Sequence, residues 1–483
     1  MWRALSVLFL FCLCLPVSAA ENPPNIVFIL ADDLGWKDLG CYGGTLAETP
    51  HLDQLAKQGL RFTNAYSPAP ICSASRASIL TGRSPARLHF EFVTKPAGVK
   101  PPARQLQPPE YTRDLPLNEV TIAEKLRQAD YATGFFGKWH VSEHYHRYLG
   151  WSPTHGPQQQ GFQSSKETFG SHPYAKKFDW KSGDFAEGEF PPDAVTEHAI
   201  EFLKQKRKQP FFLYLSYFHV HTPVRAPTDW LVKKYQKRAA MGSGDEILHT
   251  HYGAFIETLD AYVGQVLAAL DQQGLRESTL VVFTSDNGGH PEYADNAPLR
   301  GSKWNLYEAG IRVPLLVRWP QHVVADSVCS TPVSGTDLFP TFCDVARVDC
   351  SNLTLDGESL LPLFHGATAA WPERALTWHF PYYHPEKGYL NAKPEIGVND
   401  TVVSKTKPVS TIRRGNWKLL QFYETNQSEL YDLSKDPSEQ HDLSSTYPEK
   451  AAALQTELKQ RLKAQQARMP VAANEDSSSE TKN

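Results

Sequence analysis

The chain has 483 residues, of which 41% are hydrophobic and 21% are charged, and its formal net charge is -4. This composition is typical of a soluble globular protein, and the length predicts two or three domains, although one large α/β core can take most of it. Lysine and arginine are scattered along the sequence. We therefore expect neither nucleic-acid binding nor a basic amphipathic helix for membrane attachment.

The N-terminus has the pattern of a secretory signal peptide over residues 1–20. Arg3 supplies the positive charge, Leu5–Val17 forms a short apolar run, and Ser18–Ala20 offers small residues for cleavage before Glu21. The alternative is an N-terminal transmembrane anchor, but this run is too short to span a bilayer. No cysteine follows it for lipid attachment, and no later segment is long and apolar enough to span. The sequence predicts a secreted or periplasmic protein (lysosomal in an animal) with no membrane anchor.

The first two-thirds of the sequence alternates strand-like apolar runs with helical patterns. Strands are predicted at Ile26–Leu30, Tyr131–Phe136, Phe211–Phe218, Leu280–Thr284 and Val313–Val317. Helices are predicted at Pro50–Gln58, Thr121–Ala129, Ala194–Lys206 and Phe255–Asp271. This alternation predicts an α/β fold with a large, mostly parallel sheet sandwiched by helices. The proline-rich stretch Thr94–Leu117 is predicted to be a surface insertion.

Polar residues follow four of these strands at their carboxyl ends. They are Asp32 and Asp33, Lys138 and His140, His219 and His221, and Asp286 and Asn287. The carboxyl ends of an open α/β sheet share one edge, and ligands bind there. A single polar residue after a strand is usually an ordinary loop residue. Four such groups together indicate an active site at this edge.

From about residue 370 the pattern changes to short strands and one helix. The strands are predicted at Ala375–Phe380, Ser410–Arg413, Trp417–Phe422 and Leu430–Leu433, and the helix at Pro448–Gln466. This order is typical of a small α+β unit, an antiparallel sheet with a helix packed on it. We predict a catalytic domain over residues 21–369, this subdomain over 370–467, and a polar, serine-rich, disordered tail over 468–483.

The sharpest local motif is Cys72-Ser73-Ala74-Ser75-Arg76, at the start of a predicted helix. A helix N-terminus and a nearby cation would lower the pKa of the Cys72 thiol, which favours a nucleophile. A buried structural cysteine is the open alternative. Cleavage of the signal peptide leaves Cys41, Cys72, Cys329, Cys343 and Cys350. If Cys72 is modified, the other four allow three pairings, and free buried thiols are equally open.

The Cys72–Arg76 motif, followed by Leu80-Thr81-Gly82-Arg83, resembles the signature of the formylglycine-dependent (type I) sulfatases of the alkaline phosphatase superfamily. In that family, which includes arylsulfatases and carbohydrate sulfatases, a maturation enzyme oxidises the cysteine to 3-oxoalanine (formylglycine). The hydrate of this aldehyde is the nucleophile. The family more often has proline where this chain has Ala74. The resemblance also covers Asn25–Asp33, Thr49–Asp53, Gly137–His140, Phe211–Pro223, Ser285–Gly288, Arg300–Lys303, Tyr307–Pro314 and Glu429–Leu443.

The resemblance implies a set of metal ligands. They are Asp32, Asp33, Asp286, Asn287 and an oxygen of the modified Cys72. Hard oxygen donors without histidine or thiolate suit Ca²⁺, or Mg²⁺, and not zinc. The resemblance therefore implies a calcium-dependent hydrolase with an alkaline-phosphatase-like fold.

The resemblance also implies roles for five cationic or acid-base residues. Lys138 and Lys303 would bind the sulfate group, and Arg76 would steady the aldehyde hydrate. His221 would protonate the departing alcohol, and His140 would act as the base that helps to release sulfate. His219 would be a supporting residue.

Sulfated carbohydrates are the expected substrates of such an exported enzyme. Substrate contacts are expected from Lys138, His221, Lys303, His290 and Trp304, where Trp304 either stacks on a sugar or packs in the fold. Specificity is expected in Tyr145–Trp151, Ser171–His172, Arg225, His290–Asn296 and Trp378–His384, with His144, His146, His172 and His384 as candidate contacts. One alternative is a phosphonate monoester or phosphodiester hydrolase of the same superfamily, although its two-zinc phosphatases need histidine where Gly288 stands. The other is a non-catalytic protein that binds sulfated glycans.

Overall fold

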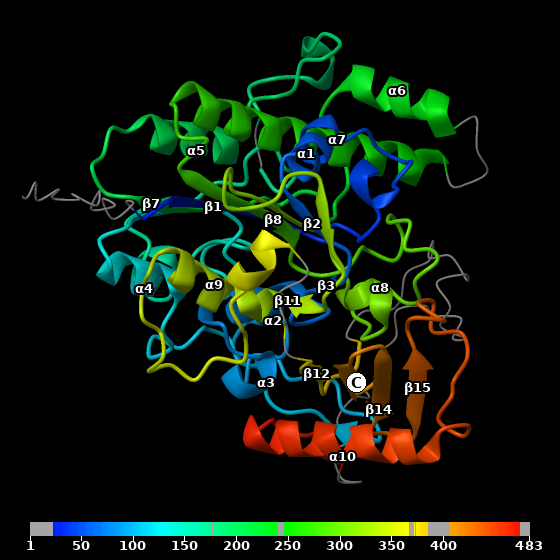
Figure 1. The fold of residues 1–483 in the computed structure, drawn as a ribbon. Helices are drawn as coiled ribbons and strands as arrows, with labels where there is room; N and C mark the ends of the chain where they lie inside the picture. The colour runs from blue at the N-terminus through cyan, green and yellow to red at the C-terminus, as the bar shows by residue number, and fades with distance from the viewer. Residues whose placement is uncertain are drawn as a thin grey trace, which may run out of the picture.

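The computed structural model describes residues 23–175, 178–239, 246–366, 371, 373–384 and 406–473. The predicted signal peptide, residues 1–20, lies outside the described residues. Among the helices of the described part, none is long and apolar enough to cross a membrane. Figure 1 shows a large sheet between two layers of helices, with a smaller sheet and a long helix beneath it.

The central sheet has eight strands in the order β10-β2-β9-β8-β1-β7-β5-β6. Their bounds are β1 (Asn25–Ala31), β2 (Leu60–Phe62), β5 (Ala132–Gly137), β6 (Ser164–Lys166), β7 (Phe211–Ser216), β8 (Thr279–Ser285), β9 (Leu315–Arg318) and β10 (Ser327–Cys329). Strand β9 is antiparallel to both of its neighbours, and the other pairs are parallel. The prediction of a large, mostly parallel sheet is confirmed.

Both faces of this sheet are buried, because successive strand side chains point to opposite faces. In β1, Ile26, Phe28 and Leu30 pack into one apolar cluster, whereas Val27 and Ile29 pack into another. Helices α1, α5 and α7 cover the second face, and α2, α4 and α9 cover the first (Figure 1). The run of apolar residues in β1 is therefore explained by burial on two sides.

The helices include all of the predicted ones, with shifted ends, and also α3, α6, α8 and α9, which were not predicted from the sequence. Their bounds are α1 (Pro50–Lys57), α2 (Cys72–Thr81), α3 (Pro85–Leu88), α4 (Ile122–Gln128), α5 (Ala194–Lys204), α6 (Asp229–Ala239), α7 (Glu246–Gln272), α8 (Glu308–Ile311), α9 (Leu338–Val345) and α10 (Pro448–Ala464). Thr121 and Glu124 form a capping box that begins α4. Gly82, with a φ of 67°, ends α2 in the left-handed region that glycine adopts without strain.

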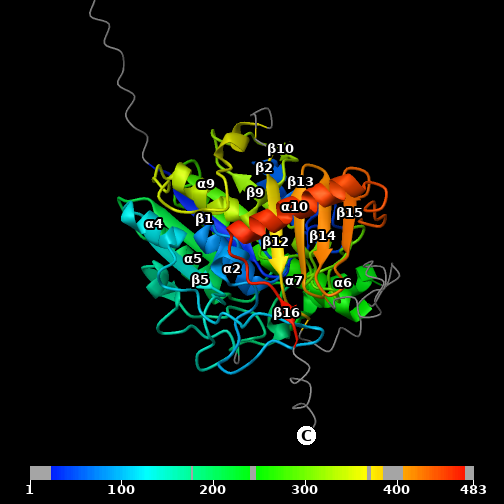
Figure 2. The ribbon, with the colours of Figure 1, turned by 90° about the horizontal axis from the view of Figure 1, so that it is seen from below.

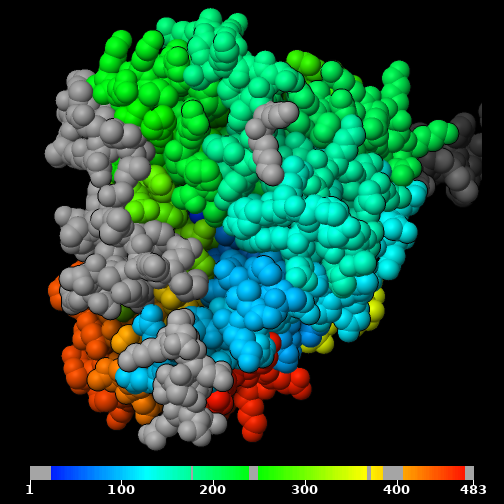
Figure 3. All heavy atoms as spheres, turned by 180° about the vertical axis from the view of Figure 1, so that it is seen from behind, coloured from blue at the N-terminus to red at the C-terminus, as the bar shows by residue number. Residues whose placement is uncertain are grey.

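Short elements complete the catalytic part. The 3₁₀ helices are η1 (Gly40–Tyr42), η2 (Pro157–Gln160), η3 (Ser182–Asp184), η4 (Gly335–Asp337) and η5 (Leu361–His365). Strand β3 (Ala65–Tyr66) pairs with β11 (Val333–Ser334). The loop-rich stretch that follows residue 90 spreads over one face of the molecule, where Figure 3 colours it from cyan to teal.

The C-terminal unit is a four-stranded antiparallel sheet in the order β12-β13-β14-β15. The strands are β12 (Ala375–Phe380), β13 (Val409–Arg414), β14 (Trp417–Phe422) and β15 (Ser428–Asp432). Leu454, Leu458 and Leu462 of α10 pack on one face of this sheet, and Figure 2 shows α10 lying across its strands. The other face packs on the catalytic part through Trp378, Tyr66 and other apolar residues. The predicted antiparallel sheet with one helix is confirmed.

The prediction of a disordered tail from residue 468 is wrong for residues 468–473. Strand β16 (Val471–Ala472) pairs with β4 (Leu106–Gln107), which lies in the predicted insertion. The Arg468 guanidinium forms an ion pair with the buried Glu91 carboxylate. These contacts hold the segment because burial of Glu91 without a partner would be costly. Residues 474–483 lie outside the described part of the chain.

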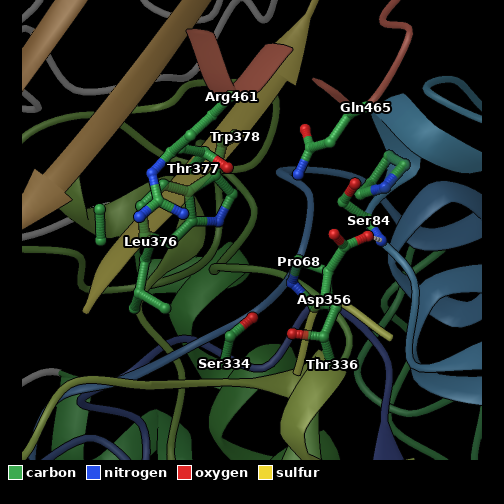
Figure 4. Close-up of a pocket in the computed structure, with 12 residues that line it drawn as sticks. Pro68, Ser84, Ser334, Thr336, Asp356, Leu376, Thr377, Trp378, Arg461 and Gln465 are labelled. Carbon is green, nitrogen blue, oxygen red and sulfur yellow. Dashed lines mark hydrogen bonds between the residues drawn. The ribbon is translucent and has the colours of Figure 1, made fainter. Parts of the chain in front are cut away.

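The five cysteines of the described residues are all free, which agrees with the free-thiol alternative. Cys72, Cys329 and Cys343 are buried. A cavity of about 60 Å³ lies between the two parts of the molecule. Figure 4 shows Arg461 of α10 and Gln465, which directly follows that helix, on one side of it and Asp356 on another. None of the predicted catalytic or metal-binding residues lines this cavity, although Trp378 of the predicted specificity segment does.

Candidate active site

The polar residues predicted at the sheet edge lie together in the structure. Strands β8, β1, β7 and β5 are parallel neighbours, so their carboxyl ends are adjacent. Asp32 and Asp33 follow β1, Asp286 and Asn287 follow β8, and Lys138 follows β5. All five are fully buried. A buried cluster of this charge needs internal partners or a ligand.

Arg76 on α2 connects the ends of three strands. Its Nε donates to Asp286 Oδ2 at 2.8 Å, and its Nη2 forms an ion pair with the same oxygen at 2.7 Å. Its Nη1 donates to the Lys138 carbonyl at 2.9 Å and to Ser216 Oγ at 2.5 Å. Ser216 was not among the predicted site residues, although it is the one hydroxyl residue at the end of the otherwise apolar Phe211–Leu215 run. Arg76 therefore fixes the positions of Asp286 and Lys138.

Two lysines neutralise the aspartates that follow β1. Lys138 Nζ lies 2.5 Å from Asp32 Oδ2, and Lys303 Nζ lies 2.7 Å from Asp33 Oδ2. Burial alone would raise the pKa of Asp33, but the charges of Lys303, His221 and Lys138 lower it below its usual range. Asp33 is therefore ionised, and the two ammonium groups face a site suited to an anion.

Cys72 lies at the first turn of α2 and points at the aspartates. Its Sγ is 3.5 Å from Asp32 Oδ1 and 3.8 Å from Asp33 Oδ1. Burial and the charge of Asp286 raise the pKa of the thiol well above its usual value, despite Lys138. The predicted lowering of this pKa is wrong, because burial and carboxylates outweigh the helix terminus. An unmodified Cys72 is thus a protonated thiol and a poor nucleophile.

The residues at this edge fit a hard divalent cation. Oxygen, sulfur or nitrogen atoms of Asp32, Asp33, Cys72 and His221 lie within 4.8 Å of one another. Asn287 donates its amide nitrogen to Asp33 Oδ1 at 2.8 Å, whereas its own Oδ1 is buried without a hydrogen-bond partner. A buried amide oxygen without a partner is costly, and coordination of a cation would satisfy it. Carboxylate and amide oxygens are the donors that Ca²⁺ and Mg²⁺ prefer.

Both oxygens of Asp286 have partners, as do those of Asp32 and Asp33. Oδ1 accepts from the Asp33 backbone amide at 3.1 Å, and Oδ2 accepts from Arg76. Burial raises the pKa of Asp286 to about 6, although Arg76 opposes this shift. A cation beside Asp286 would favour its ionised form.

His221 is oriented by a tyrosine that the sequence did not reveal. Its Nδ1 lies 2.6 Å from the Thr222 carbonyl, so Nδ1 carries the proton. The Tyr174 hydroxyl lies 2.9 Å from the same Nδ1 and donates to the Thr222 carbonyl at 2.6 Å. The Nε2 atom lies 3.7 Å from Asp33 Oδ2. No motif marks Tyr174, which lies in a loop before α5.

The other two predicted histidines differ in their surroundings. His140 is buried, and burial together with the Lys138 charge lowers its pKa well below the usual value, so its imidazole is neutral. A neutral imidazole can accept a proton. The His219 ring packs on Phe255 with centroids 4.4 Å apart, and its carbonyl accepts from the Asp32 amide at 2.9 Å. This surrounding is consistent with the supporting role expected for His219.

The predicted substrate-contact residues are only partly at the site. Burial lowers the pKa of His290 to about 3, against the charge of Asp33, which places His290 near the aspartates. Trp304 is only 4% exposed, and its ring packs against Phe92 and His384 with centroids 5.7 and 5.0 Å apart. This burial favours the packing alternative for Trp304 over a sugar-stacking role.

The remaining specificity candidates are spread more widely. His144 lies against His140, and His172 Nε2 donates to the His221 carbonyl at 2.9 Å. His146 lies against Tyr145 with centroids 3.8 Å apart, and Arg225 is exposed. The structure therefore brings His144 and His172 beside the acid-base residues, whereas the contacts of His146 are with its own loop.

Comparison with known proteins extends these observations. The model of the family described as Sulfatase matches residues 24–348, and the model described as N-sulphoglucosamine sulphohydrolase, C-terminal, matches residues 302–468. The chain belongs to the sulfatase family. This sulfatase is 32% identical to Homo sapiens arylsulfatase A over 471 residues, which cover 88% of the chain and 84% of the relative. It is 35% identical to Homo sapiens N-acetylgalactosamine-6-sulfatase over 375 residues, which cover 71% and 66%.

Solved structures agree with this assignment. The crystal structure of Ps i-CgsB has 28% identity and a TM-score of 0.71, and the alignment covers 91% of the sulfatase described here and 93% of that chain. The same protein was solved in complex with k-i-k-neocarrahexaose, with 27% identity and a TM-score of 0.70. The sulfatase described here is a sulfuric ester hydrolase with the fold of these enzymes.

Proposed function

We propose that this sulfatase is an exported enzyme that hydrolyses sulfate esters of carbohydrates, with a formylglycine made from Cys72 and a bound Ca²⁺. The similarity to N-acetylgalactosamine-6-sulfatase and to a structure that binds k-i-k-neocarrahexaose supports a carbohydrate substrate. The signal-peptide pattern of residues 1–20 supports export to a secreted, periplasmic or lysosomal location.

The observation that carries this proposal is the position of Cys72. The side chain at residue 72 projects from the first turn of α2 into a cluster of two aspartates and two lysines. A sulfate ester placed over residue 72 would therefore meet a nucleophile, two cationic donors and His221 at the same point. This arrangement suits attack at sulfur with charge developing on the sulfuryl oxygens.

Two groups would be added to the chain itself. A cation held by Asp32, Asp33, Asp286, Asn287 and residue 72 would polarise the sulfuryl oxygens, and formylglycine at residue 72 would supply the attacking hydroxyl. The maturation enzyme that makes formylglycine is an implied partner.

The protein side chains supply binding and proton transfer. Lys138 and Lys303 already bond Asp32 and Asp33, and each can turn a further ammonium proton towards a sulfuryl oxygen. His221 presents Nε2 to the site while the Thr222 carbonyl holds Nδ1–H. Only the imidazolium, protonated on both nitrogens, would deliver a proton from Nε2 to the leaving alcohol. His140, neutral and beside Lys138, would accept the proton released as sulfate leaves.

The first test measures free sulfate released from a panel of sulfated mono- and oligosaccharides with Ca²⁺ present, for the wild type and for Cys72→Ala. We expect the wild type to release sulfate from at least one sugar and the variant to lose roughly 1000-fold or more in rate, because the nucleophile is absent. Mass spectrometry of the peptide that contains residue 72 reports whether it is the aldehyde. Folded, aldehyde-bearing protein that cleaves phosphonate or phosphodiester substrates, but no sulfated sugar, would contradict the proposal.

A further inference from the structure

A continuous line of aromatic rings runs along one side of the active site. His140 lies against His144 with centroids 5.5 Å apart, and His144 lies against Tyr148 at 4.9 Å. Tyr148 lies against Tyr174 at 5.4 Å, and Tyr174 lies against His221 at 6.0 Å. These five rings, which we name the aromatic arc, join the proposed base to the proposed acid. Residues from two separate loops, 140–148 and 174, thus form one wall with the end of β7.

One member of the aromatic arc is open to solvent. Tyr148 is 52% exposed, whereas His140 and His221 are 5% and 9% exposed. The charges of Lys138 and Lys303 act on the Tyr148 hydroxyl, although burial of that hydroxyl has the larger effect and raises its pKa. The exposed Tyr148 side chain is thus placed by its ring contacts with His144 and Tyr174, which lie beside the proposed base and the proposed acid. An accessible aromatic face beside a charged site is the arrangement that binds a ligand with one apolar side.

The exposure of Tyr148 does not result from a loosely packed loop. Its neighbour Leu149 is 2% exposed and packs with Phe169 and Phe218 in a buried apolar cluster. The Arg147 guanidinium lies over the Phe169 ring at 4.3 Å and forms an ion pair with Glu167. Both neighbours of Tyr148 in the chain are thus anchored. The ring is held at the edge of the site by the residues around it.

The aromatic arc also contains unsatisfied polar atoms. His140 Nδ1 and His144 Nε2 are buried and have no hydrogen-bond partner among the described residues. Buried polar atoms without partners are rare because they are costly. A bound ring that carries hydroxyl groups could satisfy them after a small rearrangement, whereas a hydrocarbon ring such as a sterol could only stack.

We propose that Tyr148 is the platform on which the sugar ring of the sulfate ester stacks, with His144 as a partner for one of its hydroxyl groups. A pyranose has an apolar face of C–H groups, which can stack on the Tyr148 ring. It also has hydroxyl groups, which can form a hydrogen bond with the His144 imidazole. Because Tyr148 lies between His144 and Tyr174, a stacked sugar lies beside His221, which would protonate its oxygen. This inference rests on the proposed function and assigns its sugar contacts to Tyr148 and His144.

The test measures binding and turnover separately. Dissociation constants for the best sulfated sugar of the panel are measured by calorimetry on Cys72→Ala protein, with and without Tyr148→Ala. KM is measured for Tyr148→Ala, Tyr148→Phe and Tyr148→Trp in the enzyme with Cys72 intact. We expect Tyr148→Ala to raise both constants by roughly 3- to 10-fold, the range of an aromatic contact, and Phe or Trp to restore them.

The matched control is Tyr145→Ala, in the same loop. Tyr145 is 46% exposed, and its ring lies against His146 outside the aromatic arc. The stacking proposal requires a clearly smaller change for Tyr145→Ala than for Tyr148→Ala. Equal changes in the two variants, or an unchanged dissociation constant for Tyr148→Ala, would overturn it. Absence of Cys72-dependent sulfate release from every sugar would instead show that the proposed function has failed.

Discussion

Asn287 shows how a single residue can report on a metal. Its Oδ1 is buried without a hydrogen-bond partner, while its Nδ2 is bound to Asp33 Oδ1. An atom in that position stabilises the protein only when a cation or another donor reaches it. Binding of the ion would remove the free-energy cost of leaving Asn287 Oδ1 buried without a partner. The melting temperature of the protein should therefore rise when Ca²⁺ binds.

We expect Ca²⁺ to raise the melting temperature of the wild type and to raise that of Asn287→Leu less. A ligand at 100 times its Kd stabilises the folded state by about 2.7 kcal/mol, and loss of one ligand atom increases Kd. Melting curves with EGTA and with Ca²⁺ measure both increments. Asn305→Leu is the matched control, because Asn305 is also buried but its Oδ1 already accepts from the Ser302 amide. An equal calcium increment in Asn287→Leu would contradict this role.

From the sequence, the aspartates and Lys138 were predictable because they follow the ends of strands, and Arg76 because it lies in the Cys72 motif. Lys303 was expected only from the family resemblance over Arg300–Lys303. The sequence could not reveal Tyr174, because a tyrosine in a loop has no periodicity or spacing that marks it. It misjudged the direction of the pKa shift of the Cys72 thiol and left open whether Trp304 stacks on a sugar or packs in the fold. The thiol pKa depends on burial and on Asp286, and the burial of Trp304 depends on the C-terminal sheet. Both are properties of distant segments that meet only in the fold.

At the scale of elements, the capping box of α4 is a local feature with a measurable effect. Thr121 Oγ1 accepts from the Glu124 amide at 3.2 Å and donates to the Gln160 carbonyl at 2.8 Å. We expect Thr121→Ala to lower the free energy of unfolding by about 1–2 kcal/mol, measured by urea denaturation. Thr456→Ala is the control, because the exposed Thr456 hydroxyl bonds only within α10. A change below about 0.5 kcal/mol for Thr121→Ala would contradict the capping role.

Elements with long periodic patterns were predictable, and short ones were not. Strands β1, β5, β7 and β8 are mainly apolar runs with clear ends, so their type and their positions along the chain followed from the sequence, whereas their order in the sheet did not. Strands β2 and β10 have three residues each, which is too few for a pattern. The reversed direction of β9 was also hidden, because a buried strand has the same composition in either direction. Only its pairing with β8 and β2 determines its direction.

At the scale of the whole molecule, a buried charge cluster joins the two domains. Lys418 of β14 lies 3.0 Å from Glu308 of α8 and 2.9 Å from Glu439. All three are buried, and Glu308 follows the loop that carries Lys303. One ammonium group faces two carboxylates. Burial would raise the pKa of Glu308, but Lys418 and Arg413 lower it, whereas burial raises that of Glu439 to about 7.

This cluster predicts a pH dependence of stability. A raised folded-state pKa means that Glu439 stabilises the protein below its unfolded pKa, near 4.5, and that this contribution is lost as pH rises through about 7. Glu439→Gln cannot ionise. We therefore expect its free energy of unfolding, relative to the wild type, to increase between pH 5 and pH 8. Urea denaturation at both pH values measures this, with the exposed Glu449→Gln as control. A difference that does not change with pH would contradict the prediction.

The contact between Arg468 and Glu91 has a consequence for biosynthesis. The two residues are 377 positions apart, and Glu91 is 1% exposed in the folded protein. A ribosome releases the chain from the N-terminus, so Glu91 emerges long before its counter-charge. Until Arg468 has also emerged, water must remain around Glu91, and the strand pair β4–β16 cannot form. The nascent catalytic part would therefore complete its packing around Glu91 only after this segment has been released, and a chain that stops before residue 468 would remain open at this point.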